Sequence, residues 1–161
     1  MKTELVKLVT FRLGVDAFAA EVSSVDRVLR YAAPKSVPDL PEWIAGVIEH
    51  RAKVIPVVDM RARIGLPHTD PAPTTRILVL NTSDGFIGAI VDVVAEVASV
   101  PQANVAPPPP LFRGLAAHFV RGIAKVGEQL VVILDVDRVL TSDDRIAFER
   151  AVESAEAALR G

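Results

Sequence analysis

The segment GVIEHRAKVIPVVDM (Gly46–Met60) recurs without a gap as GIAKVGEQLVVILDV (Gly122–Val136), and this repeat indicates the architecture of the chain. The alignment places Gly46 on Gly122 and Asp59 on Asp135. An earlier part of the chain repeats as well, with Val9, Phe11, Val22, Val25 and Val28 aligned on Leu78, Leu80, Val91, Val94 and Val97. The sequence therefore contains two related halves.

Each half consists of short apolar runs of strand length, separated by turn formers such as Gly14 and Ser83-Asp84-Gly85. This pattern predicts an all-β fold in which each half forms a small barrel of about five strands. We expect residues 1–161 to form one domain, with subdomain one at about 8–66 and subdomain two at about 75–140. A C-terminal helix is expected over about 142–160, capped by Thr141 or Ser142.

Composition excludes several classes of function. The chain has 161 residues, no cysteine and a formal net charge of −2, so disulfide frameworks and thiolate metal sites are ruled out. There is no basic surplus for nucleic acid. The N-terminus lacks the apolar run of a signal peptide, and no segment is suited to insertion in a membrane, which predicts a cytoplasmic protein.

Four features are candidates for chemistry or structure. Asp59, Asp92 and Asp135 each follow an apolar run; a carboxylate cluster for acid–base or metal chemistry is conceivable, but capping of a one-turn helix is favoured. The three histidines, His50, His68 and His118, lack metal-ligand spacing and are expected at the surface.

The run VAPPPP (Val105–Pro110) is either a stiff loop or a polyproline ligand, and the stiff loop is favoured. Arg51 is either merely solvated or functional.

The motif GVIEHRAKVIPVVDMRARIGLP (Gly46–Pro67) resembles the CheW family of chemotaxis coupling proteins. The likeness extends over nearly the whole chain, including Leu8–Val28, Thr75–Val97 and Phe119–Leu140. Members of that family consist of two SH3-like five-stranded barrels, which agrees with the repeat. The resemblance implies a non-enzymatic adaptor without a cofactor, which couples the cytoplasmic tip of a methyl-accepting chemoreceptor to the regulatory domain of a CheA-type histidine kinase.

The resemblance also implies two sets of contact residues. Receptor-binding positions correspond to Val25, Val28, Gly46, Arg51 and Val97, and kinase-binding positions correspond to Val22, Arg27, Ala106 and Leu111. The chain departs from the family pattern at Arg27, Glu49, His50, Ala52 and Ala106. These departures concern the identity of the partners, and an auxiliary chemosensory pathway is one possibility. The rival hypotheses are a small-ligand sensor that uses a groove between the barrels and an aspartate-based metal hydrolase.

Overall fold

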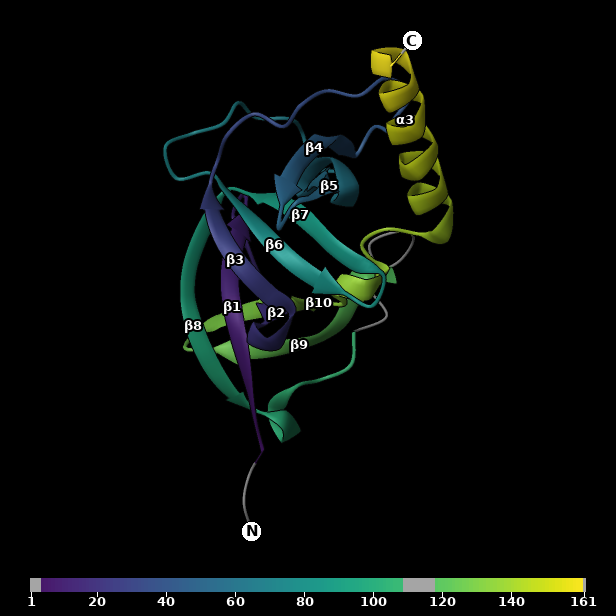
Figure 1. Cartoon of the computed structure of the whole chain (residues 1–161). Helices are drawn as coiled ribbons and strands as arrows, with labels where there is room; N and C mark the ends of the chain where they lie inside the picture. The colour runs from purple at the N-terminus through teal and green to yellow at the C-terminus, as the bar shows by residue number, and fades with distance from the viewer. Residues whose placement is uncertain (1–3, 109–117, 161) are drawn as a thin grey trace.

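The computed structural model describes residues 4–108 and 118–160, and within them the strands form two five-stranded sheets (Figure 1). Sheet A has the order β8 (Val93–Pro101), β1 (Leu5–Leu13), β2 (Asp16–Glu21), β10 (Gln129–Leu134) and β9 (Val120–Val126). Sheet B has the order β3 (Val25–Arg30), β6 (Arg76–Thr82), β7 (Gly85–Val91), β5 (Lys53–Asp59) and β4 (Ile44–His50).

The two sheets are related by the sequence repeat, strand for strand and in register. Val28 on β3 faces Leu78 on β6, and the repeat-equivalent Val97 on β8 faces Val9 on β1. The parallel contact between β5 and β7 has its counterpart between β10 and β2. The repeat is therefore a pseudo-twofold symmetry of the fold.

The strands do not follow the predicted subdomains of 8–66 and 75–140. Strands β1 and β2 of the first half pair with β8 and β10 of the second, while β6 and β7 complete sheet B. The short 3-10 turn Val22–Ser24 carries the chain from β2 to β3, and Asp92 marks the corresponding crossing from β7 to β8. Each sheet thus takes strands from both halves, and the two halves of the sequence cannot form separate barrels.

Each sheet also closes on itself. Strands β3 and β4 are the opposite edges of sheet B, yet Asp26 on β3 lies 2.7 Å from His50 on β4. The opposite edges of sheet A, β8 and β9, are likewise in contact. The predicted all-β class, with two five-stranded barrels and a C-terminal helix, is confirmed.

The main core lies between the sheets. Phe11 of sheet A and Leu78 and Ile87 of sheet B belong to one buried cluster, which also includes Met60 and Phe119. These side chains form a packed core in the space between the sheets. The hypothesis of a small-ligand sensor finds no support in the structure.

Aspartate side chains cap the N-termini of two short helical turns. Asp59 accepts from the backbone N–H of Arg61 and Ala62 at the start of α1 (Met60–Ile64), and Asp135 accepts from Asp137 N–H at the 3-10 turn Val136–Arg138. The capping predicted for these two residues is confirmed, and they lie in different sheets. Gly65 ends α1 with φ of 83°, a left-handed conformation that favours glycine.

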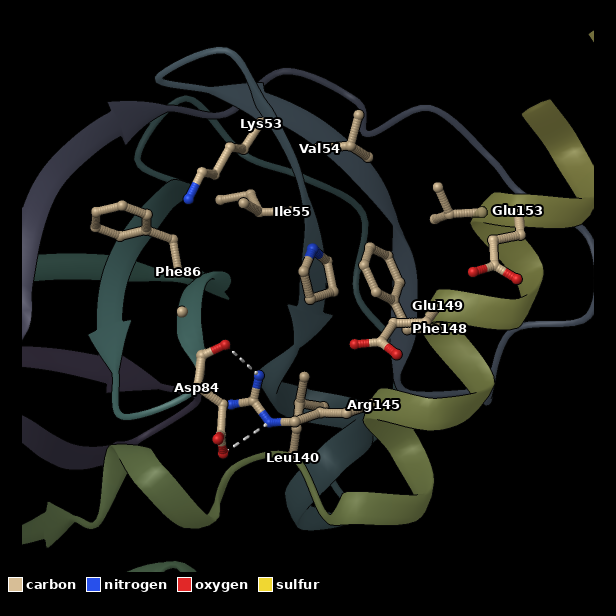
Figure 2. A pocket seen from close by; sticks show the side chains of 13 residues that line it. Lys53, Val54, Ile55, Asp84, Phe86, Leu140, Arg145, Phe148, Glu149 and Glu153 are labelled. Carbon is tan, nitrogen blue, oxygen red and sulfur yellow. Dashed lines mark hydrogen bonds and ion pairs between the residues drawn. The ribbon is translucent and has the colours of Figure 1, made fainter.

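The C-terminal helix α3 (Ser142–Arg160) begins at Thr141, whose hydroxyl accepts from Asp144 N–H while Asp144 accepts from Thr141 N–H. Its first turn is tied to the turn between β6 and β7, because Arg145 donates to Thr82 Oγ1. Arg145 also pairs with Asp84 (Figure 2). The predicted helix is confirmed with Thr141 as its cap. In the described part of the chain, no helix is both long enough and apolar enough to cross a bilayer.

Candidate partner-binding surfaces

Arg51 occupies the two-residue turn between β4 and β5 with its guanidinium held by a carboxylate. Arg51 and Ala52 have φ of 52° and 63°, left-handed conformations that are uncommon for residues with a Cβ. The Arg51 Nε and Nη2 atoms donate to Asp26 Oδ2 and Oδ1 at 3.3 and 3.2 Å. The turn geometry and the forked pair together fix where the charge of Arg51 lies.

His50 is the third residue of this cluster, which it forms with Asp26 and Arg51. Its Nε2 lies 2.7 Å from Asp26 Oδ2, and its ring packs edge-on against Phe86 with centroids 5.0 Å apart. Because a carboxylate only accepts, Nε2 is the donor. The Arg51 guanidinium and then the His50 ring hold the pKa of Asp26 below its usual value. His50 is buried, so its predicted surface position is wrong, whereas His68 and His118 are exposed as predicted.

The cluster leaves Arg51 accessible. Its side chain keeps 58% of its surface exposed, against 19% for Asp26. Its guanidinium also lies 5.9 Å from the centre of the Phe86 ring, a cation–π contact. Arg51 therefore combines a defined position with free donors that can meet a carboxylate from outside.

The other receptor-binding candidates differ in exposure. Val28 on β3 and Val97 on β8 are 44% and 64% exposed, and they are repeat-equivalent residues on edge strands of the two sheets. Val25 is half-buried against the core. The structure brings Val25, Val28 and Arg51 together on or beside β3, while Val97 belongs to the other sheet.

Gly46 is buried, and a structural reason accounts for the glycine. A Cβ at Gly46 would collide with the backbone carbonyl of Lys35, which forms an isolated bridge to Val47. At the repeat-equivalent Gly122, a Cβ would lie 2.8 Å from the Ala106 carbonyl oxygen, and Ala106 bridges to Ile123. Both glycines allow a loop to cross a strand closely.

The kinase-binding candidates lie on separate elements. Val22, 36% exposed, lines a shallow pocket with Leu5 and Lys7 at the start of β1. Arg27 is exposed on β3, and Ala106 is exposed next to β9. Leu111 lies outside the described residues.

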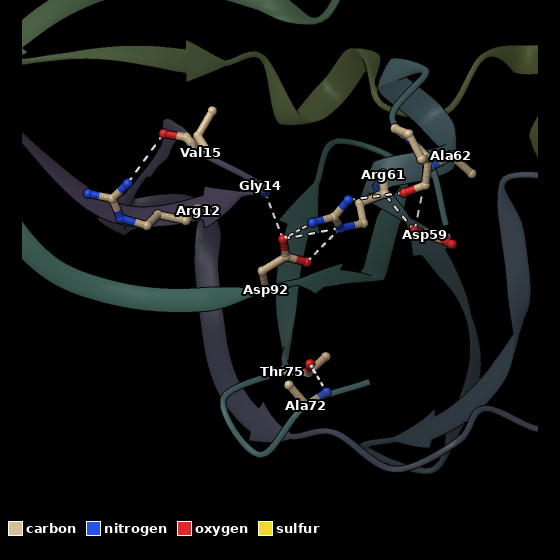
Figure 3. A network of polar contacts seen from close by, with 10 residues as sticks. Arg12, Gly14, Val15, Asp59, Arg61, Ala62, Ala72, Thr75 and Asp92 are labelled. Carbon is tan, nitrogen blue, oxygen red and sulfur yellow. Dashed lines mark hydrogen bonds and ion pairs between the residues drawn. The ribbon is translucent and has the colours of Figure 1, made fainter. Parts of the chain in front are cut away.

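The third aspartate does not cap a helix, because β8 begins directly at Val93. Asp92 instead accepts from Arg61 Nη2 at 2.6 Å and Arg61 Nε at 2.9 Å, and from Gly14 N–H at 2.7 Å (Figure 3). These contacts join α1, which follows sheet B, to the β1–β2 turn of sheet A. Arg61 lowers the pKa of Asp92, and Asp92 raises that of Arg61. The capping predicted for Asp92 is wrong, and the residue instead links the two sheets through Arg61 and Gly14.

Arg63 is a residue that the sequence patterns missed. It is buried at 5% exposure, with its guanidinium 4.5 Å from the centre of the Trp43 ring and 4.6 Å from that of Phe119. Its Nε donates to the Val139 carbonyl, and its Nη2 pairs with Asp144 at 3.4 Å. Burial lowers the pKa of Arg63. Trp43 and Phe119 are equivalent residues of the sequence repeat, and no local pattern indicates that an arginine packs between them.

The described residues contain no group of three or more histidine, aspartate or glutamate side chains placed to hold a metal ion. The charged residues described above therefore have structural roles: Asp59 and Asp135 cap helical turns, Asp92 links the two sheets, and Arg63 packs between aromatic rings. The exposed valines and Arg51 are suited to contacts with another macromolecule. Fold and surface thus define a protein-interaction module built from two interleaved five-stranded barrels.

Comparison with known proteins agrees with that class. The model of the CheW-like domain matches residues 7–144, and the chain belongs to this family. It is 26% identical over 145 residues to the chemotaxis protein CheW of Treponema pallidum, covering 88% of this chain and 85% of that protein. It is 29% identical over 143 residues to the protein FrzA of Myxococcus xanthus, covering 88% and 87%. The crystal structure of the scaffolding protein TtCheW from Thermoanaerobacter tengcongensis is similar, with a TM-score of 0.80, 28% identity and coverage of 89% and 92%.

Proposed function

We propose that this chain is a chemosensory coupling adaptor that binds the cytoplasmic tip of a chemoreceptor and the regulatory domain of a CheA-type histidine kinase. The observation that carries the proposal is the CheW-like domain match over residues 7–144 together with the matching fold of a scaffolding protein. The adaptor acts in the cytoplasm at receptor arrays, without catalysis and without a cofactor.

For the receptor, we assign the surface of sheet B around Arg51, Val25 and Val28, together with Val97 on the edge strand β8 of sheet A. Asp26 orients Arg51 so that its free donors can form a charge-assisted pair with a carboxylate on a helical tip. Val28 and Val97 add exposed apolar area at repeat-equivalent places. Gly46 has no side chain that a partner could contact. It contributes indirectly, because the absence of a Cβ lets the backbone at Lys35 pack closely against β4.

For the kinase, we assign Val22 as an apolar anchor and Arg27 as a charge that selects the partner. An exposed valine beside a shallow pocket suits a packed contact, and a rim charge acts chiefly on partner choice and association rate. We assign Ala106 and Leu111 to a second contact, on the part of the chain that precedes β9 in the sequence.

Co-purification from the organism's own cells tests the proposal. A tagged chain should recover a histidine kinase and a chemoreceptor together. Arg51→Glu should reduce receptor recovery while kinase recovery and thermal stability change little, because Arg51 is exposed and its pairing with Asp26 is at the surface.

Arg150→Glu is the matched control, since Arg150 is exposed on α3, away from β3. Equal receptor recovery by both variants would contradict the assignment of Arg51. Recovery of neither a kinase nor a receptor by the unmodified chain would overturn the proposed function itself.

A further inference from the structure

A groove runs between α3 and sheet B, with a volume of about 440 Å³ (Figure 2). Phe148 and Val152 of α3 form one wall, and Val54 and Ile55 of β5 form the other. The ion pair between Asp84 and Arg145 closes one end. Most of the inner surface is therefore apolar, whereas the rim is charged.

Polar contacts tie α3 to the body of the protein at its first turn, and further along the helix Phe148 packs against the main core and Ala151 is buried. The Thr141–Asp144 box and the bonds from Arg145 hold that turn against the body of the protein. Further along, Phe148 and Val152 remain half-buried, and Val54 across the groove keeps 41% of its surface exposed. Apolar side chains thus face each other across a space that they do not fill.

The rim carries charges of both signs, with Lys53 on the β5 side and two glutamates on the α3 side, and the α3 side favours one kind of ligand. Glu149 and Glu153 are exposed on α3 four residues apart, so they lie on the same side of the helix. No ion pair engages either of them among the described residues, whereas Arg145 is committed to Asp84. A ligand that lies along α3 would leave both carboxylates uncompensated unless it carried positive charge on that edge.

The groove adjoins the cluster that holds Arg51. Phe86 lines the groove and also packs on the His50 ring and beside the Arg51 guanidinium. A ligand in the groove would therefore touch the same aromatic ring that supports Arg51. The two surfaces are neighbours, but they use different side chains.

We propose that this groove binds an amphipathic helix of a protein partner, with apolar residues packed between Phe148 and Val54 and with basic residues opposite Glu149 and Glu153. An open trough with apolar walls and a charged rim suits the packing of a helix into a groove. The Nε of Arg145 is a buried donor in the described lining, and it faces Asp84 at 3.4 Å, so it is not free to orient a small ligand. The proposal does not depend on the proposed function.

Binding of designed peptides tests this inference. One probe is an amphipathic helical peptide with leucines three and four residues apart and lysines beside them; its sibling has the same leucines and glutamates in place of the lysines. Titration of the full chain is followed by the amide signals of Phe86, Glu149 and Val152 in NMR spectra. The lysine peptide should shift these signals and bind about tenfold more tightly than the glutamate peptide.

Two variants and one control make the result decisive. The double substitution Glu149→Lys and Glu153→Lys should reverse the preference between the peptides, and Val54→Ser should weaken both. Glu128→Lys changes a charge in the β9–β10 turn, outside the groove, and should change neither affinity. All of these residues are exposed, so the fold should persist, as thermal melting can check.

Three results would overturn the proposal. The first is an absence of shifts at these amides up to about 1 mM lysine peptide, the range of very weak binding. The second is equal affinity for the two peptides in the unmodified chain. The third is concentration-dependent self-association that Val54→Ser abolishes, since it would show that a second copy of the chain occupies the groove.

Discussion

Replacing Asp92 by asparagine should loosen the connection between the two sheets. Asp92 and Arg61 are mostly buried, with side-chain exposures of 26% and 16%, and the carboxylate accepts from both Arg61 and Gly14. Asparagine keeps the shape but removes the charge, and its amide nitrogen cannot accept a hydrogen bond. Hydrogen bonds to charged groups contribute about 1.5–3 kcal/mol, so the free energy of unfolding should fall by roughly that amount at pH 7.

The dependence on pH follows from the lowered pKa of Asp92. A carboxyl whose pKa is lower in the folded state stabilises the protein above its unfolded pKa of about 3.9. That contribution is lost as the pH falls through the folded-state value. The stability difference between the unmodified chain and Asp92→Asn should therefore be complete near neutral pH and shrink in acid.

Urea unfolding followed by circular dichroism, repeated from pH 7 to pH 3, measures both effects. Asp70→Asn is the matched control, because the Asp70 side chain is 98% exposed. Its effect should stay within about 0.5 kcal/mol, as is usual for surface substitutions. A loss of stability for Asp92→Asn no larger than that of the control at pH 7 would contradict the role of Asp92 in joining the sheets. So would a deficit that persisted unchanged at pH 3.

Three further changes test other parts of the structure. Arg63→Ala should lower the free energy of unfolding by about 3–5 kcal/mol in urea titrations, since it leaves Asp144 buried without its partner; a loss below 1 kcal/mol would contradict a structural role. Gly46→Ala should destabilise by about 1–3 kcal/mol through the collision with Lys35, whereas Gly127→Ala meets only open space, so its cost comes from its φ of 62° alone. Arg27→Glu should change the rate of association with the kinase regulatory domain in a salt-dependent manner without changing stability, as stopped-flow mixing can show; salt-independent rates would place Arg27 outside the contact.

Local features of the structure could be predicted because they depend on residues close together in the sequence. The caps at Asp59 and Asp135 and the start of α3 at Thr141 each rest on a side chain that bonds a backbone N–H two or three residues away. The repeat also predicted the equivalence of Gly46 and Gly122. The similarity of its two halves is a property of the chain itself.

The candidate sites could be predicted less completely. Exposure of Val28, Val97 and Arg51 agrees with a binding role, but no pattern indicated that Asp26 would hold Arg51 or that His50 would be buried. Asp26 lies on β3 and His50 and Arg51 at the end of β4, the opposite edges of sheet B. Their contact exists only because the sheet closes, which a local pattern does not report.

Local patterns in the sequence indicate the apolar runs, the turns, the C-terminal helix and the internal repeat, together with the caps at Asp59 and Asp135. The pairing of the strands is visible only in the folded protein, where β1 and β2 lie beside β8 and β10 instead of within their own half. The alternation of apolar residues specifies the buried face of a strand but not the identity of its neighbour. That choice is made by burial of Phe11, Leu78 and Phe119 in one core between the sheets, a contact among residues far apart in the chain.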